Sequence, residues 1–484
     1  MNGNRTDKKQ QNAQSSQMLS HIYGQTAENR NSCEKFLKYY VTNSVDEIIA
    51  DPEGNSGHEC LNIYTMLSTL KQDATMMDET RERLQYIVND VGRQNGYQED
   101  GSFIYHDYWP IEGMYGASTL VNGVIMAYSA LGGTAFALKD PTPMLDWMLK
   151  TFRPVTHQSA SMSMVNGRSP EKGISYGRLT LTAALLLLDS FDEEGTLKLK
   201  QFIRSMVLEG SDARNETVCS YLAQKLGRVD LVQRLKDVCL EEDIPEDVTP
   251  FAHVRYMTDR VTQHQKDYTV GVAMSSTRMA IPESINGQNA YGFYGADGAV
   301  YVYNSLTDVN TDQYGDTYHR FANMYRIAGT TEEDSTTRKP QHNHKAYLPG
   351  TTYSYNSSTN KETWTISKNK DGVDAGTFVG GVELAGQYAV AAMDFEAYSW
   401  TSAESTAEIA AIKAKGHDPN AENHQKKQVL TSDLTAKKSY FMFDDEIVCV
   451  GSGINFPTNS NAVIATAKLD VDHATLGADG ITAK

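Results

Sequence analysis

The chain has 484 residues and a mass of 53.6 kDa, which is more than one hydrophobic core usually serves, so two or more domains are expected. Lys and Arg number 44 and Asp and Glu number 61, which leaves a formal net charge of -17. The field of this charge repels nucleic acids and anionic membranes, and we expect neither as a partner. The five cysteines are scattered without a C-x-x-C spacing, which disfavours a zinc knuckle and a disulfide framework.

The chain shows neither a membrane span nor a secretory signal. Its longest apolar run, between Leu181 and Leu188, is far shorter than the roughly 20 residues that a membrane helix needs. The first residues, MNGNRTDKKQQNAQSS, are polar and lack an apolar signal region. This pattern predicts either a cytoplasmic protein or a chain that lacks its natural beginning.

Up to about residue 240 the apolar side chains recur at helical spacing, as in Leu84, Ile87, Val88 and Val91. The helices come in pairs without an obvious sequence repeat, which favours a stacked or toroidal array of helical hairpins. The candidate helices are 33–49, 58–70, 115–131, 142–151, 175–191, 197–208, 215–226 and 229–240.

The segment EEDIPEDVTP interrupts this pattern, because its carboxylates and the prolines Pro245 and Pro250 oppose helix continuation. We therefore predict two domains, 1–245 and 246–484. Beyond the break, β-branched and aromatic residues alternate with a period of two, which is typical of antiparallel sheet in a layered sandwich. An Ala-, Glu- and Lys-rich insertion between Thr401 and Gln428 predicts a short helix or a mobile loop that leaves the sheet domain. The strand candidates are DYTVGVAM, GAVYVYNSL, ETWTISKN, GTFVGGVEL, QYAVAAMDFEAY and KSYFMFDDEIVCVGSGI.

The common cofactor fingerprints are absent: there is no H-E-x-x-H, no P-loop and no G-x-G-x-x-G after a strand. Any chemistry must come from ordinary side chains. The most suggestive segment is 95–118, which places His106, Trp109 and several tyrosines around glycine turns just ahead of a helix. The structural alternative is a loop whose aromatic side chains only close the end of the helical array.

The segment DGSFIYH is followed by MYG, so that Tyr115 lies nine residues after His106. This arrangement of a histidine and a tyrosine resembles that of polysaccharide lyase family 8, which includes hyaluronate, chondroitin AC and xanthan lyases. NGR at 166–168, ISYGR ending at Arg178, the long stretch 257–303, YRIAGTT and LTAKKSYFMFDDEIVCVGSGI follow in the family's order. Together these matches span about residues 55–454.

The resemblance implies a multidomain α and β protein: an N-terminal α/α toroid, incomplete here, followed by a C-terminal antiparallel β-sandwich that is cut short at its end. It implies β-elimination in an acidic polysaccharide at a uronic acid, which leaves a C4–C5 unsaturated uronate. It also implies a secreted, extracellular or cell-surface protein, and we expect a monomer. We expect no cofactor and no metal; a structural calcium ion on the acidic sheet domain has no D-x-D-x-D-G loop to support it.

The chemistry explains why the family needs its residues. The proton on C5 is weakly acidic, so an enzyme must neutralise the neighbouring carboxylate, remove the proton and protonate the departing oxygen. By resemblance, Asn55, which lies about fifty residues before His106, neutralises the carboxylate, and Tyr115 acts as base and then as acid. His106 helps to bind the carboxylate or to remove the proton. The structural alternatives are a helix N-terminal turn for Asn55, a buried aromatic for Tyr115 and a satisfied loop histidine for His106.

Two arginines match the family's R-G-R-x-I-S-R stretch. Arg168 would orient the sugar and hold Tyr115 in its reactive state through a charge-assisted hydrogen bond; its alternative is an ordinary salt bridge. The sequence departs from the family at Asn166, which replaces the first arginine, and in the residues inserted before Arg178. Arg178 is therefore a substrate-binding candidate on weaker grounds.

The sheet domain contributes the stretch ESINGQN, which matches the family's E-x-x-N-G-E-N with Gln288 in place of the second acid. Glu283 would order Arg168 from across the domain interface, and Asn286 and Asn289 would bind substrate; all three could equally form a turn at a strand end. Trp109 is a candidate surface for stacking on a sugar ring.

Two rival functions stay open. A glycoside hydrolase on a similar toroid would need a paired acid and base such as Glu99 and Asp107. A non-catalytic glycan-binding remnant is favoured by the absence of the family's W-W-D-W-E-I-G patch.

Overall fold

A computed structural model describes a large part of the chain and divides it into two compact units. The helical unit contains Met1–Gly101, Glu112–Arg153 and Ser175–Asp247, and the sheet unit contains Ser102–Ile111, Pro154–Ile174 and Val248–Lys484. The candidate helix 33–49 and the insertion 401–428 lie almost entirely outside the described residues. These are 55–89, 96–105, 109–207, 218–241, 243–245, 247, 249–276, 279, 283, 288–304, 313–333, 351–356, 361–366, 378–396, 414, 434–455 and 464–466.

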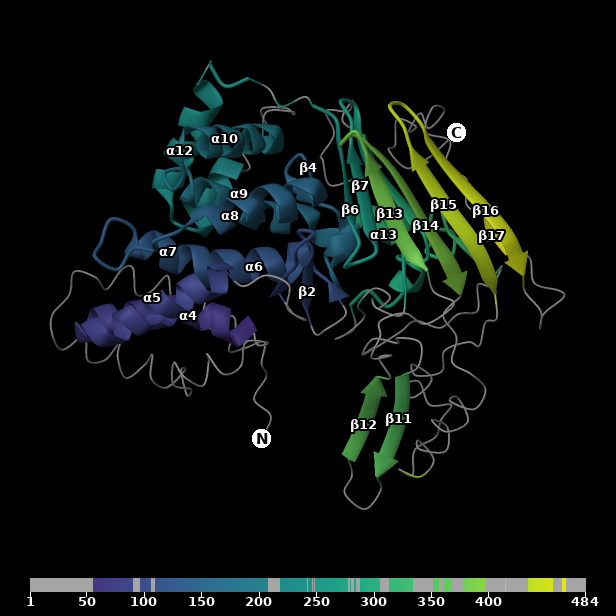
Figure 1. Ribbon diagram of the computed structural model, residues 1–484, viewed down its shortest axis with the longest axis horizontal. Coiled ribbons are helices and arrows are strands. Elements are labelled where there is room, and N and C mark those ends of the chain that lie inside the picture. The colour runs from purple at the N-terminus through teal and green to yellow at the C-terminus, as the bar shows by residue number, and fades with distance from the viewer. Residues whose placement is uncertain are drawn as a thin grey trace. The chain divides into compact units, whose positions relative to one another are not determined.

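The described part of the helical unit begins with the hairpin of α4 (Asn55–Lys71) and α5 (Ala74–Asn89), which pack against each other (Figure 1). The connection is short because Gln72 adopts a left-handed φ of 53° and the Asp73 carboxylate accepts a hydrogen bond from the Met76 amide at 3.0 Å. One face of α5 buries Leu84 and Val88, as its helical spacing predicts.

Three helical stretches in the described part of this unit contain π-helical turns, η7 (Tyr221–Lys225) among them, and two of the stretches are long. The first runs through η1 (Glu112–Gly116), α6 (Ala117–Thr119), η2 (Leu120–Ile125) and α7 (Met126–Leu131). The second runs through α8 (Thr142–Asp146) and η3 (Trp147–Phe152). A π-helical turn accommodates an extra residue and shifts the side chains that follow it, and such turns are frequent at functional sites.

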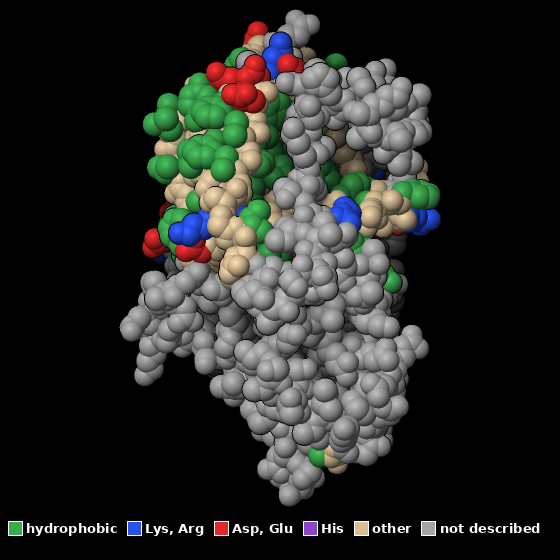
Figure 2. Space-filling model, turned by 90° about the vertical axis from the view of Figure 1, so that its right-hand side faces the viewer, with side chains coloured by type: hydrophobic (Ala, Val, Ile, Leu, Met, Phe, Trp, Pro, Cys, Tyr) green, Lys and Arg blue, Asp and Glu red, His purple; other side chains and the backbone are tan. Residues whose placement is uncertain are grey.

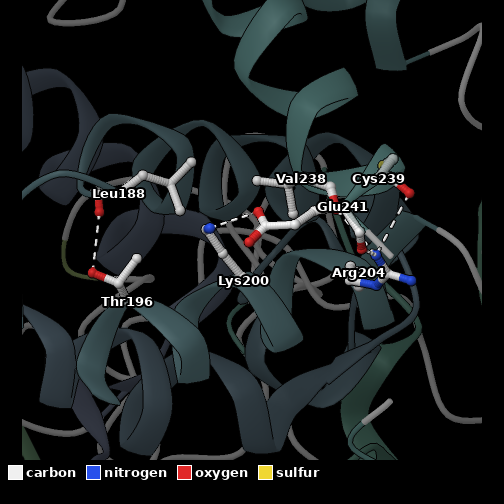
Figure 3. A network of polar contacts seen from close by, with 7 residues as sticks. All are labelled: Leu188, Thr196, Lys200, Arg204, Val238, Cys239 and Glu241. Atoms are coloured by element: carbon white, nitrogen blue, oxygen red, sulfur yellow. Dashed lines mark hydrogen bonds and ion pairs between the residues drawn. The ribbon is translucent and has the colours of Figure 1, made fainter. Parts of the chain in front are cut away.

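The remaining helices are α9 (Gly173–Leu186), α10 (Glu193–Val207), η7 (Tyr221–Lys225) and α12 (Val229–Leu240). Arg204 on α10 caps the C-terminus of α12, because its Nη1 donates to the carbonyls of Val238 and Glu241 at 3.1 and 2.8 Å (Figure 3). One turn earlier, Lys200 pairs with the Glu241 carboxylate at 2.6 Å. A cation at a helix C-terminus satisfies its last carbonyls and complements the helix dipole.

The sheet unit contains two four-stranded antiparallel sheets, which lie face to face in Figure 1. The first has the order β6-β7-β8-β9 and the second the order β13-β14-β15-β16. In the second sheet Ala391 of β14 faces Gly381 of β13 and Tyr440 of β15. The strands are β6 (Phe251–Arg255), β7 (Arg260–His264), β8 (Tyr268–Ala273), β9 (Ala299–Asn304), β13 (Val379–Leu384), β14 (Tyr388–Glu396), β15 (Thr435–Met442) and β16 (Ile447–Asn455).

Shorter elements complete this unit and connect its strands. The hairpin β11 (Thr351–Asn356) and β12 (Lys361–Ile366) and the pair of β10 (Thr331–Glu333) with β17 (Ile464–Thr466) are antiparallel. The other short elements are β2 (Phe103–Tyr105), β3 (Trp109–Pro110), β4 (Thr156–His157), β5 (Ala160–Ser161), η5 (Ser163–Val165), η6 (Pro170–Lys172), η8 (Gly292–Tyr294) and α13 (Asp316–Phe321). The predicted order, helical first and antiparallel sheet second, is confirmed; a closed toroid stays a prediction.

The inner faces of the two sheets form one hydrophobic core. Val270 and Val272 of β8 pack with Met393 and Phe395 of β14 and with their neighbours, as expected for the inward positions of alternating strands. Removing this apolar surface from water contributes about 25 cal/mol for each Å² and is the main force that joins the layers.

A buried cation ties the second sheet to the loops of the first. The Lys438 ammonium on β15 donates to the carbonyls of Asp297 and Gly329 at 2.8 and 2.7 Å, and the Tyr440 hydroxyl donates to the carbonyl of Gly298 at 3.0 Å. Gly298 has a φ of +79°, and a Cβ there would meet the Tyr440 hydroxyl. Only glycine fits this close approach.

The outer face of the second sheet carries a row of apolar side chains as well. Val382, Val390, Phe441 and Val448 lie opposite one another across the four strands, and Val382 and Val448 are exposed. Every residue of β16 after Ile447 is exposed. Figure 2, which looks onto the side where β16 lies, shows hydrophobic side chains gathered in a patch. Among the described residues, no helix is long and apolar enough to cross a membrane.

Candidate functional site

Arg168 belongs to a segment that packs on the first sheet. Met162 and Met164 approach the backbone of Gly271 on β8 so closely that a Cβ there would clash with both. Asn166 is fully buried, and its side chain exchanges hydrogen bonds with the hydroxyl and the carbonyl of Ser161 at 2.8 and 3.3 Å. The residue that replaces the family's first arginine therefore fixes the loop that carries Arg168.

The structure brings Arg168 and Glu283 together. The Arg168 Nη1 donates to Glu283 Oε1 at 2.8 Å, and the Arg168 backbone N–H donates to Oε2 of the same carboxylate at 3.2 Å. The Nε donates to the Gln288 side-chain oxygen at 3.1 Å. The Glu283 side chain is 2% exposed and the Arg168 side chain 16% exposed, so this is a largely desolvated pair in which several contacts fix the guanidinium plane.

Asn289 holds the loop that presents Glu283. Its side-chain amide donates to the Glu283 carbonyl at 3.0 Å, and its backbone adopts a left-handed φ of 52°, which asparagine tolerates better than most residues. Arg168, Glu283, Gln288 and Asn289, which we call the arginine cluster, thus form one network within the sheet unit. Asn286 lies outside the described residues.

Two opposing effects set the ionisation of Glu283. Burial raises the pKa of this carboxyl, and the charge and hydrogen bonds of Arg168 lower it in part. The balance leaves the pKa above the ordinary value for a glutamate. Protonation of Glu283 would remove the negative partner of the guanidinium, so the geometry of the cluster depends on pH.

A pocket adjoins the arginine cluster within the sheet unit. Glu283 and Asn289 lie in its wall together with Ser163, Tyr318 and His319. The rest of the wall is mainly apolar, with Ile111, Met164, Pro170, Met324 and Ile327 among its residues. Apolar walls with a few fixed polar groups are typical of small-molecule sites.

Tyr115 lies in the π-helical turn η1 of the helical unit and is half-buried. Glu112 in the same turn is fully buried, and Tyr97 stacks on Trp147 with ring centroids 4.4 Å apart. The Tyr97 hydroxyl donates to the Gly116 carbonyl at 3.4 Å. Burial and, to a smaller extent, the charge of Glu112 raise the pKa of Tyr97 well above its ordinary value. Tyr97 therefore stays neutral beside this turn.

Arg178 has a different environment from Arg168. It lies on α9 in the helical unit with its guanidinium 5.3 Å from the centre of the Tyr221 ring, and burial lowers its pKa. This stacking gives Arg178 a structural role, and its role in substrate binding stays a prediction.

The other predicted site residues are placed by their elements alone. Asn55 is the first residue of α4, and Trp109 lies on β3 opposite Tyr105. His106 and Asp107 lie outside the described residues. Glu99, the other member of the carboxylate pair that a hydrolase would need, is exposed. No observation on the described residues favours that rival.

The structure also adds residues to the site. Gln288 follows from the altered family motif, but Tyr318 and His319 lie in a stretch without a recognisable motif, and only the tertiary structure places them beside Glu283. Within the part of the chain that the structure describes, no three His, Cys, Asp or Glu side chains gather as metal ligands do. The expectation that no cofactor is needed stays a prediction.

Comparison with known proteins identifies the family. Residues 17–205 match the model of the N-terminal alpha-helical domain of polysaccharide lyase family 8, and residues 252–480 match that of its super-sandwich domain. The chain belongs to polysaccharide lyase family 8. The two matches follow the order of the helical and sheet segments described above.

Curated relatives of this family-8 chain include a hyaluronate lyase of Staphylococcus aureus, which is 26% identical over 413 residues, or 82% of this chain and 42% of the relative. A xanthan lyase of a Bacillus species is 26% identical over 75% of this chain and 31% of its own length. The chain thus spans less than half the length of these two relatives.

Solved structures show the same fold. The chondroitin AC lyase of Streptomyces coelicolor, determined with chondroitin sulphate, has a TM-score of 0.70 at 19% identity and covers 92% of this chain and 53% of its own. A Paenibacillus xanthan lyase has a TM-score of 0.59 at 21% identity, over 82% of this chain and 32% of its own.

Proposed function

We propose that this protein is a carbon–oxygen lyase that cleaves an acidic, uronic-acid-containing polysaccharide of the hyaluronan, chondroitin or xanthan type by β-elimination. The observation that carries the proposal is the arginine cluster: the Arg168 guanidinium is fixed by Glu283 and Gln288 in a largely desolvated site. The family of the chain and the names of its relatives support the same chemistry.

The reaction needs no oxidant and no water. The C5–H bond breaks and its proton goes to a base, and the electron pair that is left forms the C4–C5 double bond. The C4–O bond to the next sugar breaks, and the departing oxygen takes up a proton from an acid. The atoms balance with one unsaturated uronate and one new hydroxyl end.

The residues of this chain divide these tasks. Tyr115, as phenolate, takes the C5 proton and, as phenol, returns one to the departing oxygen. Asn55 and His106 bind the uronate carboxylate, which makes C5–H more acidic by stabilising the charge that develops on the carboxylate. Arg168 donates to the sugar and stabilises the tyrosinate. Glu283 acts through Arg168 and is a positioning residue.

The substrate also suggests where the protein works. Acidic polysaccharides of these types are found outside cells, and we place the activity there. The net charge of -17 repels a polyanion at long range, so substrate binding depends on short-range contacts at sites such as the arginine cluster.

The proposal is tested by incubating the protein with hyaluronan, chondroitin sulfate and xanthan and measuring the ultraviolet absorbance of the new double bond. We expect absorbance to rise with at least one of them. Release of reducing ends without that absorbance would mean hydrolysis, and glycan binding without any product would mean a binding protein. Either result overturns the proposal.

Tyr115→Phe tests the assignment of the base, because it removes one hydroxyl and keeps the ring. We expect a loss of at least a hundredfold in rate, comparable with the loss of a group that acts in the transition state. Tyr128→Phe is the matched control, since Tyr128 is a half-buried tyrosine on α7 of the same unit. Equal rates for the two variants would contradict the role of Tyr115.

A further inference from the structure

The pocket beside the arginine cluster contains a histidine whose hydrogen bonding is incomplete. His319 lies on α13 and in the pocket wall, and its Nε2 is buried without a hydrogen-bond partner among the described residues. A buried polar atom without a partner is costly to the fold, and such an atom in a pocket wall is a candidate contact for a ligand.

The His319 ring is held in a fixed orientation. Tyr318 packs edge-on against it with centroids 5.2 Å apart, and Tyr314 packs edge-on against Tyr318 at 4.7 Å. The Tyr314 hydroxyl accepts a hydrogen bond from the Val302 amide of β9 at 2.8 Å. The aromatic chain from the sheet to the pocket therefore positions the imidazole before any ligand binds.

The other side of the ring determines which tautomer is present. The Tyr314 backbone forms a hydrogen bond with His319 that favours the protonated ring nitrogen, and because Nε2 has no partner, this nitrogen is Nδ1. Burial lowers the pKa of His319 to about 4, so the ring is neutral near pH 7. In a neutral ring with the proton on Nδ1, Nε2 is an acceptor and needs a donor from the ligand.

The neighbouring charged groups of the pocket leave Nε2 of His319 without a donor. The Arg260 Nη1 donates to the carbonyls of Thr258, Asp259 and Met274, and the Glu283 carboxylate is engaged by Arg168. A carboxylate or a sulfate ester offers acceptors alone, so it would face the lone pair of Nε2 without a proton to share.

We propose that His319 is a specificity-determining residue whose Nε2 accepts a hydrogen bond from an uncharged donor of the glycan, a sugar hydroxyl or an acetamido N–H, and that the pocket disfavours a sulfated group at that position. This inference rests on the proposed lyase function for its substrate class. The methyl or ring carbons that accompany such a donor would pack against Met164, Met324 and Ile327.

The first experiment measures kcat/KM for two pairs of substrates. One pair is unsulfated chondroitin and chondroitin sulfate, and the other is hyaluronan and N-deacetylated hyaluronan. We expect His319→Phe to lower kcat/KM for the preferred unsulfated substrate about tenfold, the effect of losing one neutral hydrogen bond, and to reduce its preference over the sulfated one. His319→Gln keeps an acceptor and should restore most of the loss. The acetylated and deacetylated pair tells whether the donor is an acetamido group or a hydroxyl.

His253→Phe is the matched control, because His253 is a partly exposed histidine on β6 that pairs with Glu383 and does not line the pocket. We expect its substrate preference to equal that of the wild type. A drop in melting temperature of His319→Phe without any change in the sulfated to unsulfated ratio would mean a purely structural role and would overturn the inference.

A second measurement does not depend on turnover. The ¹⁵N shift of His319 Nε2 should move when an unsulfated chondroitin tetrasaccharide is added to Tyr115→Phe, as the lone pair accepts a hydrogen bond. Normal turnover with no shift and no effect of His319→Phe refutes the pocket and leaves the lyase function intact. A shift without turnover on any glycan refutes the lyase function and leaves the pocket standing.

Discussion

Glu283→Gln perturbs the arginine cluster with almost no change in volume. In the wild type, the Glu283 carboxylate accepts hydrogen bonds from both the Nη1 and the backbone N–H of Arg168. A carboxamide has only one oxygen to replace the two. One donor therefore loses its partner, at about 1–3 kcal/mol, and the guanidinium loses its negative neighbour. Removing the partner altogether in Glu283→Ala should cost about 3–5 kcal/mol, because it leaves a mostly buried charge alone.

The same change should slow the reaction. If Arg168 stabilises charge in the transition state, its misplacement forfeits part of the about 2.7–4 kcal/mol that such a donor contributes, and we expect kcat/KM to fall about tenfold to a hundredfold. Initial rates of double-bond formation measure this effect, and urea unfolding of the same samples shows whether the fold is retained. As the pH is lowered, wild-type activity should also decline. The decline should begin at a higher pH than the ordinary pKa of a glutamate would give, because burial raises the pKa of Glu283. Glu283→Gln should lack that decline.

The control for these measurements is Glu194→Gln, which neutralises a carboxylate in the exposed pair with Lys198 at 2.6 Å. Exposed pairs contribute about 0–1 kcal/mol, so neither stability nor rate should change much. An unchanged rate in Glu283→Gln, together with a large loss in Arg168→Ala, would refute the view that Glu283 positions the arginine.

Three further predictions concern stability. Arg204→Met should lower the urea midpoint by the equivalent of about 1–3 kcal/mol, because three carbonyls at the end of α12 lose their donor; an unchanged midpoint contradicts the cap. Gly298→Ala should destabilise by more than about 1 kcal/mol in calorimetry, since the φ of +79° and the Tyr440 hydroxyl both oppose a Cβ. Burial lowers the pKa of Lys438 from 10.5 to about 8, so the unfolded chain binds more protons between these values and the free energy of unfolding should rise as the pH rises from 8. Lys438→Met should flatten that rise in urea titrations between pH 8 and 9.5.

Periodicity predicted the classes of structure well, because helical and strand spacing are local properties of the chain. The strand candidate QYAVAAMDFEAY contains β14, and the candidate KSYFMFDDEIVCVGSGI covers most of β15 and β16. The π-helical turn that holds Tyr115 could not be predicted, since one extra residue in a turn barely changes the apolar spacing. The membership of 102–111 and 154–174 in the sheet unit was equally invisible, because it depends on tertiary packing.

The candidate site divides in the same way. The family resemblance predicted that Glu283 orders Arg168 from across the domain interface. The structure confirms their contact but places both residues in the sheet unit. The roles of Asn55, His106 and Tyr115 stay predictions. His319 had no signal in the sequence, because its significance comes from one unpartnered nitrogen and from a tautomer set by the backbone of Tyr314.

The row of Val382, Val390, Phe441 and Val448 has a practical consequence for work with the purified protein. Among the described residues this row reaches β16, the edge strand of its sheet. Apolar surface next to an edge strand draws other molecules together as the concentration rises. Specific activity should therefore be compared across a range of enzyme dilutions. A specific activity that increases on dilution would reveal self-association through this sheet. An assay at a single concentration would instead make the enzyme look like a poor catalyst.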